Sequence, residues 1–309
     1  MPPLSRVGAC LALLLLSAHA GADASWHPFM WAATAQPNLT SDRAAILLPV
    51  QLDGHACVMQ LDTGAGTSVL YRPLLPANYA VTGERLAVAR FGIGQLESPR
   101  SFMLMYDDDA AHRGPGCREH EGRRRVGTIG NDVFADGSLT LDLQNARFRF
   151  ARAPAPGPAP SVPMTLMPSG NGHGLVPVID ATLADGRIVP LLFDTGSAPM
   201  ELGVFRRAEW LALVGPDGAR DAATLTTVAW GKPLVCRVAP ILHALHIGPV
   251  VLDAHARATF CVRDIIPLFE GLAQFGLVGM VPFRDKVVTL DYVRKRLSIE
   301  AAETIQDGR

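Results

Sequence analysis

The sequence predicts a mostly β chain made of two related halves, with only short helices. Two observations lead to this prediction: short apolar runs are punctuated by Asp-Gly turns, and one set of landmarks occurs twice in the same order. The 309 residues are 49% apolar, which suffices to bury a sizeable core and excludes disorder as the main state. We therefore expect one large domain or two small ones.

The first element is a predicted export signal over residues 1–20. Arg6 precedes an apolar stretch at 7–16, and the small residues Ala18 and Ala20 follow it. This is the order of charge, apolar core and cleavage site in a secretory signal peptide. The apolar stretch is about half the roughly 20 residues that a membrane-spanning helix needs. We therefore expect a periplasmic or secreted protein with no stable membrane anchor after cleavage.

The rest of the chain is expected to contain two homologous lobes. An N-terminal segment at 21–45 leads into a first lobe at 46–151, and the second lobe at 175–300 ends in a tail at 301–309. Residues 152–174, between the lobes, alternate Pro with small residues and then become Gly-rich. That composition is typical of an interdomain linker.

Within each lobe the sequence favours strands. The runs at 46–52, 139–143 and 287–291 are short and rich in apolar residues. Helix signals are few, and we expect short helices only at 205–213 and 264–273.

The repeated landmark is an Asp-Thr-Gly turn that follows an apolar run. Asp62-Thr63-Gly64-Ala65 in the first half matches Asp194-Thr195-Gly196-Ser197 in the second half. Further on, Ile129-Gly130 and Thr140-Leu141-Asp142 match Val278-Gly279 and Thr289-Leu290-Asp291. One Asp-Thr-Gly occurs by chance in about one of every ten to twenty chains of this length. Two copies in the same context indicate an internal duplication with a shared chemical purpose.

The chemistry that this repeat favours depends on paired carboxylates. Two carboxyls beside one water cannot both ionise readily, so one stays protonated as an acid while the other acts as a base. Asp62 and Asp194 are therefore the candidate catalytic pair, for hydrolysis through an activated water. Gly64 and Gly196 permit the sharp turn that projects each Asp.

These residues resemble the aspartic peptidases of the pepsin and retropepsin type. The resemblance spans about residues 46–299, and the halves are most similar to bacterial retropepsin-like domains fused in tandem. It implies a bilobal acid-protease fold, in which two β-barrel-like lobes hold the active site between them. It also implies roles for residues around the dyad: Thr63 and Thr195 brace the two turns, and Gly130 and Gly279 support them, with Gly64, Gly196 and Ser197 in the turns themselves.

A closing flap is the part of that pattern which the sequence supports least. The first half has only residues 71–92 in which to build one. In the second half, 226–240 is expected to form a hairpin that turns at Trp230 and Gly231, the candidate flap residues.

The cysteines predict disulfides. Removal of the signal leaves Cys57, Cys117, Cys236 and Cys261, an even count that fits an oxidising compartment. Three pairings are possible. If the halves fold separately, Cys57 pairs with Cys117 and Cys236 pairs with Cys261.

The resemblance implies a peptide or protein substrate as the partner, and the charge balance indicates no other. The 28 Lys and Arg residues nearly cancel 29 Asp and Glu, which gives no reason to expect nucleic acid. His243 and His246 lie three apart on an expected strand and face opposite sides, so we expect no metal there and no cofactor. We expect a monomer, because the duplication supplies both carboxylates in one chain. The alternative function is a non-catalytic protein that binds extended peptides in the same cleft.

Overall fold

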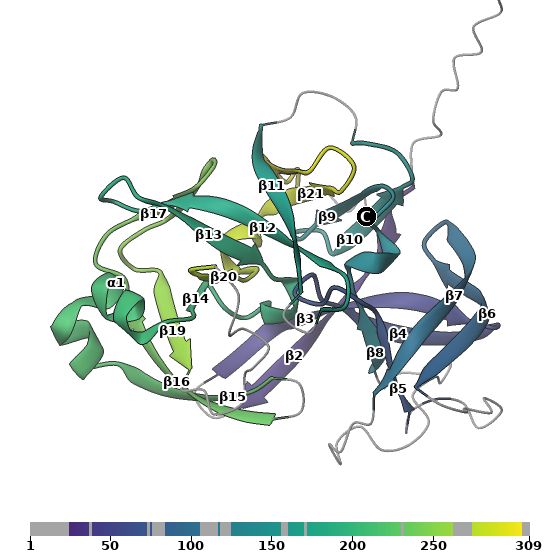
Figure 1. Cartoon of the computed structure of the whole chain (residues 1–309), viewed down its shortest axis with the longest axis horizontal. Helices are drawn as coiled ribbons and strands as arrows, with labels where there is room; N and C mark the ends of the chain where they lie inside the picture. The colour runs from purple at the N-terminus through teal and green to yellow at the C-terminus, as the bar shows by residue number, and fades with distance from the viewer. Residues whose placement is uncertain are drawn as a thin grey trace, which may run out of the picture.

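The chain is described by a computed structural model, which covers residues 25–36, 39–72, 75, 84–105, 117, 125–155, 160–169, 172–229, 232–261 and 274–304. The expected signal peptide at 1–20 and the expected helix at 264–273 lie outside these residues. Strands dominate both halves, and two related groups of elements lie side by side in Figure 1. The predicted fold class, mostly β with two related halves, is confirmed.

The first half consists of ten strands and a 3₁₀ turn among its described residues. They are β1 (His27–Pro28), β2 (Met30–Gln36), β3 (Leu39–Leu52), β4 (His55–Leu61), β5 (Val69–Tyr71), β6 (Arg85–Ile93), β7 (Leu96–Met105), β8 (Arg125–Ile129), η3 (Asn131–Val133), β9 (Ser138–Asp142) and β10 (Arg147–Ala151). Seven of these strands form one sheet in the order β2-β3-β4-β8-β5-β7-β6. Because β3 also pairs with β6, this sheet closes on itself like a small barrel.

The second half repeats this plan with additions. Its elements are β11 (Ser161–Pro168), β12 (Leu175–Thr182), β13 (Ile188–Phe193), η4 (Thr195–Ser197), β14 (Leu202–Val204), α1 (Arg207–Arg220), β15 (Ala223–Ala229), β16 (Lys232–Pro240), β17 (Leu245–Ile247), β18 (Val250–Leu252), β19 (Arg257–Cys261), β20 (Gly276–Val278), η6 (Val281–Phe283), β21 (Lys286–Asp291) and β22 (Arg296–Ala301). Helix α1 lies between β14 and β15, where the described part of the first half has no helix. The extra residues that the sequence places between the repeated blocks therefore include this helix.

Tight glycine turns mark equivalent hairpins in the two halves. Gly94 joins β6 to β7 with φ of 57°, and Gly248 joins β17 to β18 with φ of 54°. A left-handed backbone of this kind costs glycine nothing and most other residues about 1 kcal/mol or more. Ile93-Gly94 of the first half and Ile247-Gly248 of the second half therefore correspond in structure.

One sheet is shared by both halves. Its order begins β1-β10-β9-β21-β22-β11 and continues β12-β13-β20-β14-β19-β16-β15, so that β9 of the first half pairs with β21 of the second. At the centre of that antiparallel pair, Thr140 lies opposite Thr289, and their hydroxyl oxygens are 3.1 Å apart. These two residues are each other's counterparts in the duplication, so an approximate two-fold axis passes between them.

Some boundaries differ from those expected. The expected linker at 152–174 contains strand β11, which pairs with β22 and β12 and so belongs to the shared sheet. The expected N-terminal segment at 21–45 contains β1, β2 and the start of β3. The helix expected at 205–213 runs over Arg207–Arg220, with a kink at Gly215.

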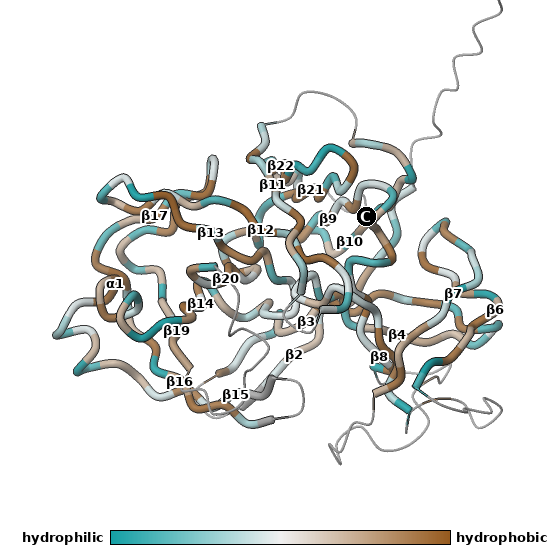
Figure 2. The backbone as a smooth tube through the Cα atoms, viewed as in Figure 1, coloured by the Kyte–Doolittle hydropathy of each residue, from teal (hydrophilic) through white to brown (hydrophobic). Residues whose placement is uncertain are grey.

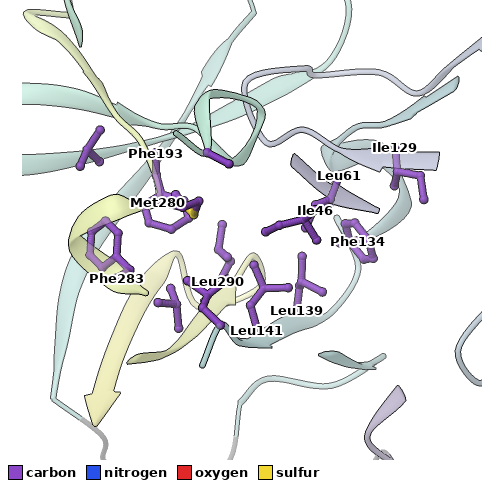
Figure 3. Packing of buried hydrophobic residues seen from close by; sticks show 14 of the residues in the cluster. Ile46, Leu61, Ile129, Phe134, Leu139, Leu141, Phe193, Met280, Phe283 and Leu290 are labelled. Carbon is purple, nitrogen blue, oxygen red and sulfur yellow. The ribbon is translucent and has the colours of Figure 1, made fainter. Parts of the chain in front are cut away.

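The hydrophobic core is continuous across the two halves. Figure 2 shows apolar residues along the strands of both halves and hydrophilic residues at many of the turns between them. In Figure 3, Leu139, Leu141 and Leu290 of the shared sheet lie between Phe193 of the second half and Leu61 of the first. All five side chains are fully buried. The core thus anchors the strands that lead into both Asp-Thr-Gly turns.

No helix among the described residues is long and apolar enough to cross a bilayer.

Candidate active site

The two Asp-Thr-Gly turns are built in the same way. Strand β4 leads into Asp62 and pairs in parallel with β8, while β13 leads into Asp194 and pairs in parallel with β20. The backbone N–H of Asp62 donates to Ile129 O at 3.0 Å, and that of Asp194 donates to Val278 O at 3.0 Å. The pairing therefore extends one residue past each strand and aims both carboxyl groups at the boundary between the halves.

The two carboxyl groups meet there. The side chains of Asp62 and Asp194 interact with each other, and each carboxyl lies against the turn glycine of the other half. Each also accepts a bond from its own turn: Gly64 N–H donates to Asp62 Oδ1 at 2.8 Å, and Gly196 N–H donates to Asp194 Oδ1 at 2.9 Å. Asp194 is buried and Asp62 is half-buried. The pair thus has a fixed geometry in which one proton can be held between two carboxyls.

The glycines of the turns leave space for the opposite carboxyl group. A methyl group on Gly196 would lie 2.5 Å from Cγ of Asp62, and one on Gly64 would lie 2.8 Å from Oδ1 of Asp194. Contacts this short are impossible for a real side chain. Each glycine therefore lets the partner half approach, in addition to forming its own turn.

Thr63 and Thr195 tie the two turns together. The hydroxyl of Thr63 donates to Phe193 O at 2.6 Å and accepts from the N–H of Thr195 at 3.0 Å. Reciprocally, the hydroxyl of Thr195 donates to Leu61 O at 3.1 Å and accepts from the N–H of Thr63 at 2.9 Å. Both threonines are buried. Four buried hydrogen bonds therefore fix one turn against the other, each contributing on the order of 1 kcal/mol.

Gly130 and Gly279 lie behind the turns, where a side chain would not fit. A methyl group on Gly130 would lie 2.7 Å from Ala65 O, and one on Gly279 would lie 2.2 Å from Ser197 O. The backbone after β8 and after β20 is therefore packed directly against the two turns.

The environment gives the two carboxyls different proton affinities. Burial raises the pKa of Asp62 well above its usual range, and the charge and the hydrogen bond of Asp194 raise it further. Burial also raises the pKa of Asp194, but hydrogen bonds led by that of Ser197 lower it. Asp62 is therefore the group that holds a proton, and Asp194 is the group that is charged when the pair carries one proton.

Comparisons with known proteins add a likeness in fold. No protein-family model matches the chain, and no curated protein matches it. A solved structure titled as the crystal structure of aspartic proteinase from Irpex lacteus is similar, with a TM-score of 0.46 and 11% sequence identity over 84% of this chain and 94% of that chain.

The polar residues that support the first turn escaped the sequence analysis. Asn131 donates from Nδ2 to Thr63 O at 2.7 Å and to Ala65 O at 2.9 Å. Asp132 accepts from both the N–H and the hydroxyl of Ser68, and this hydroxyl accepts from Gly130 N–H at 2.9 Å. At the matching positions of the second half stand Met280, Val281 and Met200. Polar residues in one half that match apolar residues in the other, within otherwise similar blocks, were the sequence signal that could have identified this support.

The expected hairpin of the second half is present. Strand β15 pairs with β16 in antiparallel register, with Ala229 opposite Lys232. Trp230 and Gly231 of the turn lie outside the described residues, as does most of the first half between β5 and β6. The buried Leu225 and Leu234 of the hairpin pack with Leu39, at the start of β3 in the other half. The hairpin therefore contacts the first half through apolar side chains.

Both disulfides join the cysteines of one half. Cys57 is bonded to Cys117 with their Cα atoms 4.4 Å apart, and Cys236 is bonded to Cys261 with 3.9 Å between Cα atoms. Cys236 and Cys261 lie directly opposite each other on β16 and β19, so this bond ties the hairpin to β19. Within the part of the chain that the structure describes, no three His, Cys, Asp or Glu residues are grouped to hold a metal ion.

Proposed function

We propose that the chain is an aspartic-type endopeptidase, in which Asp62 and Asp194 hydrolyse a peptide bond with an activated water. The observation that carries this proposal is the approach of the two carboxyls at the boundary between the halves, where four threonine-mediated bonds hold the duplicated turns together. A structural role alone does not require two carboxyls to meet, because desolvation and mutual repulsion make that arrangement costly.

In the proposed mechanism, one proton is held by the pair. Charged Asp194 removes a proton from a water, and the oxygen of that water attacks the peptide carbonyl carbon. Asp62 gives its proton to the carbonyl oxygen, so the tetrahedral intermediate carries no net charge. The C–N bond then breaks as a proton passes from Asp194 to the leaving nitrogen, and Asp62 recovers a proton from a hydroxyl of the intermediate. The pair ends with the one proton that it held at the start.

The domain organisation supports one active site in each chain. We infer a fused tandem of two retropepsin-like lobes, at 46–151 and 175–300, because each supplies one Asp-Thr-Gly turn and one half of the shared sheet. A monomer therefore suffices for the reaction, and a peptide or protein substrate is the partner. No cofactor enters the proposed mechanism.

The chain is further proposed to be exported to the periplasm or the medium. The two disulfides fit an oxidising compartment, and residues 1–20 have the pattern of a signal peptide. N-terminal sequencing of the exported protein tests this directly. An intact Met1 on protein recovered outside the cytoplasm would contradict cleavage.

Hydrolysis of a quenched fluorescent peptide library, measured from acidic to neutral pH, tests the peptidase function. Asp62→Asn and Asp194→Asn keep the shape of the side chain and remove its acid–base chemistry, so each should lower turnover by at least about 100-fold. The matched control is Asp185→Asn, in an exposed turn of β12 and β13. It should leave turnover unchanged. Peptides that bind without being cleaved by the folded wild-type protein would support the binding alternative and contradict the peptidase.

A further inference from the structure

We propose that Tyr292 and Asn131 form a positioning relay, which orients Asp62 from the opposite half of the molecule. Tyr292 lies just after β21 of the second half, and its hydroxyl donates to Asn131 Oδ1 of the first half at 2.6 Å. Both side chains are 3% exposed. The inference rests on the function proposed above, because positioning matters to catalysis only if Asp62 belongs to the dyad.

The Asn131 amide joins the hydroxyl of Tyr292 to the first Asp-Thr-Gly turn. With Oδ1 bound to this hydroxyl, Nδ2 directs its two N–H groups at Thr63 O and Ala65 O. The reversed amide would place an acceptor against those two carbonyls and lose both bonds to the turn. The hydroxyl of the second half therefore holds Asn131 in the orientation that supports the first turn.

The relay reaches Asp62 through a single peptide group. Thr63 O and Gly64 N–H belong to the same planar amide. Asn131 donates to the oxygen of this amide, Thr63 O, and the N–H of the same amide, on Gly64, donates to Asp62 Oδ1 at 2.8 Å. A bond accepted by the oxygen polarises the amide and strengthens the donor at its nitrogen, by about 10–30% per bond. The relay thus favours the charged form of Asp62 and holds its carboxyl in place.

Tyr292 is suited to this role because it stays protonated. Burial raises the pKa of its phenol far above the usual range, and the nearby charge of Asp132 raises it further. Asp132 is itself paired with Arg100, whose Nη1 lies 3.3 Å from its Oδ2. Asp194 is the titratable group that raises the pKa of Asp62 most. A change at Tyr292 therefore acts on Asp62 without altering any charge.

The second half has no counterpart of the relay. Leu143 and Met280 occupy the positions that match Tyr292 and Asn131 in the duplication, and both are fully buried. Neither offers a hydrogen bond to the second turn. The relay therefore acts on Asp62 alone, and by favouring its charged form it limits how far the pKa of Asp62 rises above that of Asp194.

The test is the titration of the Asp62 carboxyl, followed by carbon NMR in the full chain with labelled Asp, in wild type and Tyr292→Phe. Loss of the hydroxyl weakens the donor at Gly64, so the pKa of Asp62 should rise by about 0.2 to 0.5 unit. In peptide hydrolysis, kcat should fall and its basic limb should move to higher pH, because this limb reports loss of the Asp62 proton. KM should change little.

Tyr71→Phe is the matched control. It also removes a buried tyrosine hydroxyl of the first half, which lies 2.8 Å from the Thr128 hydroxyl. It should leave the Asp62 pKa unchanged at a similar cost in stability. Equal titration curves for wild type and Tyr292→Phe, or equal shifts in both variants, would overturn the relay. The titration needs no turnover. A shifted pKa in a protein that cleaves no peptide would uphold the relay and reject the peptidase.

Discussion

The hydroxyl of Ser197 donates to Oδ2 of Asp194 at 2.7 Å, whereas the equivalent position in the first turn is Ala65. A donor stabilises the charged carboxylate and lowers its pKa, and a methyl group does not. This single difference between the two turns favours Asp194 as the base and Asp62 as the proton carrier.

Ser197→Ala should move the acidic limb of the activity profile to higher pH by about one unit. Without the hydroxyl, the pKa of Asp194 rises, and the base holds its proton to a higher pH. The measurement is kcat/KM on a quenched peptide as a function of pH. Ser197→Thr keeps a hydroxyl and serves as the control, with a profile close to that of wild type. An acidic limb that does not move in Ser197→Ala would show that this bond does not set the roles.

The raised pKa of Asp62 predicts a pH dependence of stability. An unfolded Asp titrates near about 4. Above that pH, and up to its raised pKa, the folded chain holds a proton that the unfolded chain has lost. The free energy of unfolding should therefore fall as pH rises through this window, by at most about 1.4 kcal/mol per pH unit for one proton.

Denaturant unfolding of wild type and Asp62→Asn at several pH values measures this dependence. The variant cannot bind the extra proton, so its stability should depend less steeply on pH in the same window. Parallel stability curves for the two proteins would contradict the assignment of the held proton to Asp62.

Gly196→Ala should abolish activity while the protein stays folded. Its methyl group would lie 2.5 Å from Oδ1 of Asp62 and displace that carboxyl. We expect turnover to fall by at least about 100-fold. Gly218→Ala, on helix α1, is the control, because its methyl group has 3.4 Å to Val214 Cβ and clashes with nothing. It should keep full activity and gain up to about 1 kcal/mol in stability. An active Gly196→Ala would mean that the carboxyl has room to move.

Removal of either disulfide should destabilise the chain, and the first more than the second. The bond from Cys57 to Cys117 spans 60 residues and that from Cys236 to Cys261 spans 25. Loop-closure entropy assigns them about 4 and about 3.5 kcal/mol. Paired Cys-to-Ser variants, compared by thermal unfolding, measure this order. A larger loss from the Cys236 pair would show that local contacts of the hairpin outweigh chain entropy.

The duplicated turns were predictable because their chemistry depends on contiguous residues. Asp62 and Thr63 are adjacent in one recognisable motif. The second copy, at Asp194 and Thr195, excludes the explanation that a single short motif arose by chance. Asn131 and Tyr292 could not be found in this way. They lie 161 residues apart, and each stands where the two halves differ, so a search for repeats passes over them.

Strand β11 was missed for a different reason. Composition made residues 152–174 resemble a flexible connector, with its prolines at 154–160 and its glycines at 170–174. Between these ends, Val162, Met164 and Leu166 alternate with polar residues and prolines, which is a strand pattern. The strand forms because its backbone pairs with β22 on one side and with β12 on the other. Neither neighbour is adjacent to it in a way that the local sequence of β11 reveals.

The pairing of Thr140 with Thr289 across the shared sheet bears on which substitutions the two halves can accept independently. A dimer of identical subunits that met along this axis would carry the same residue at every related position. A covalently continuous chain escapes that restriction, so a substitution in one copy leaves the other copy intact. Ser197 matches Ala65, and the polar residues Asn131 and Tyr292 match the apolar Met280 and Leu143; a dimer of identical subunits could carry neither difference.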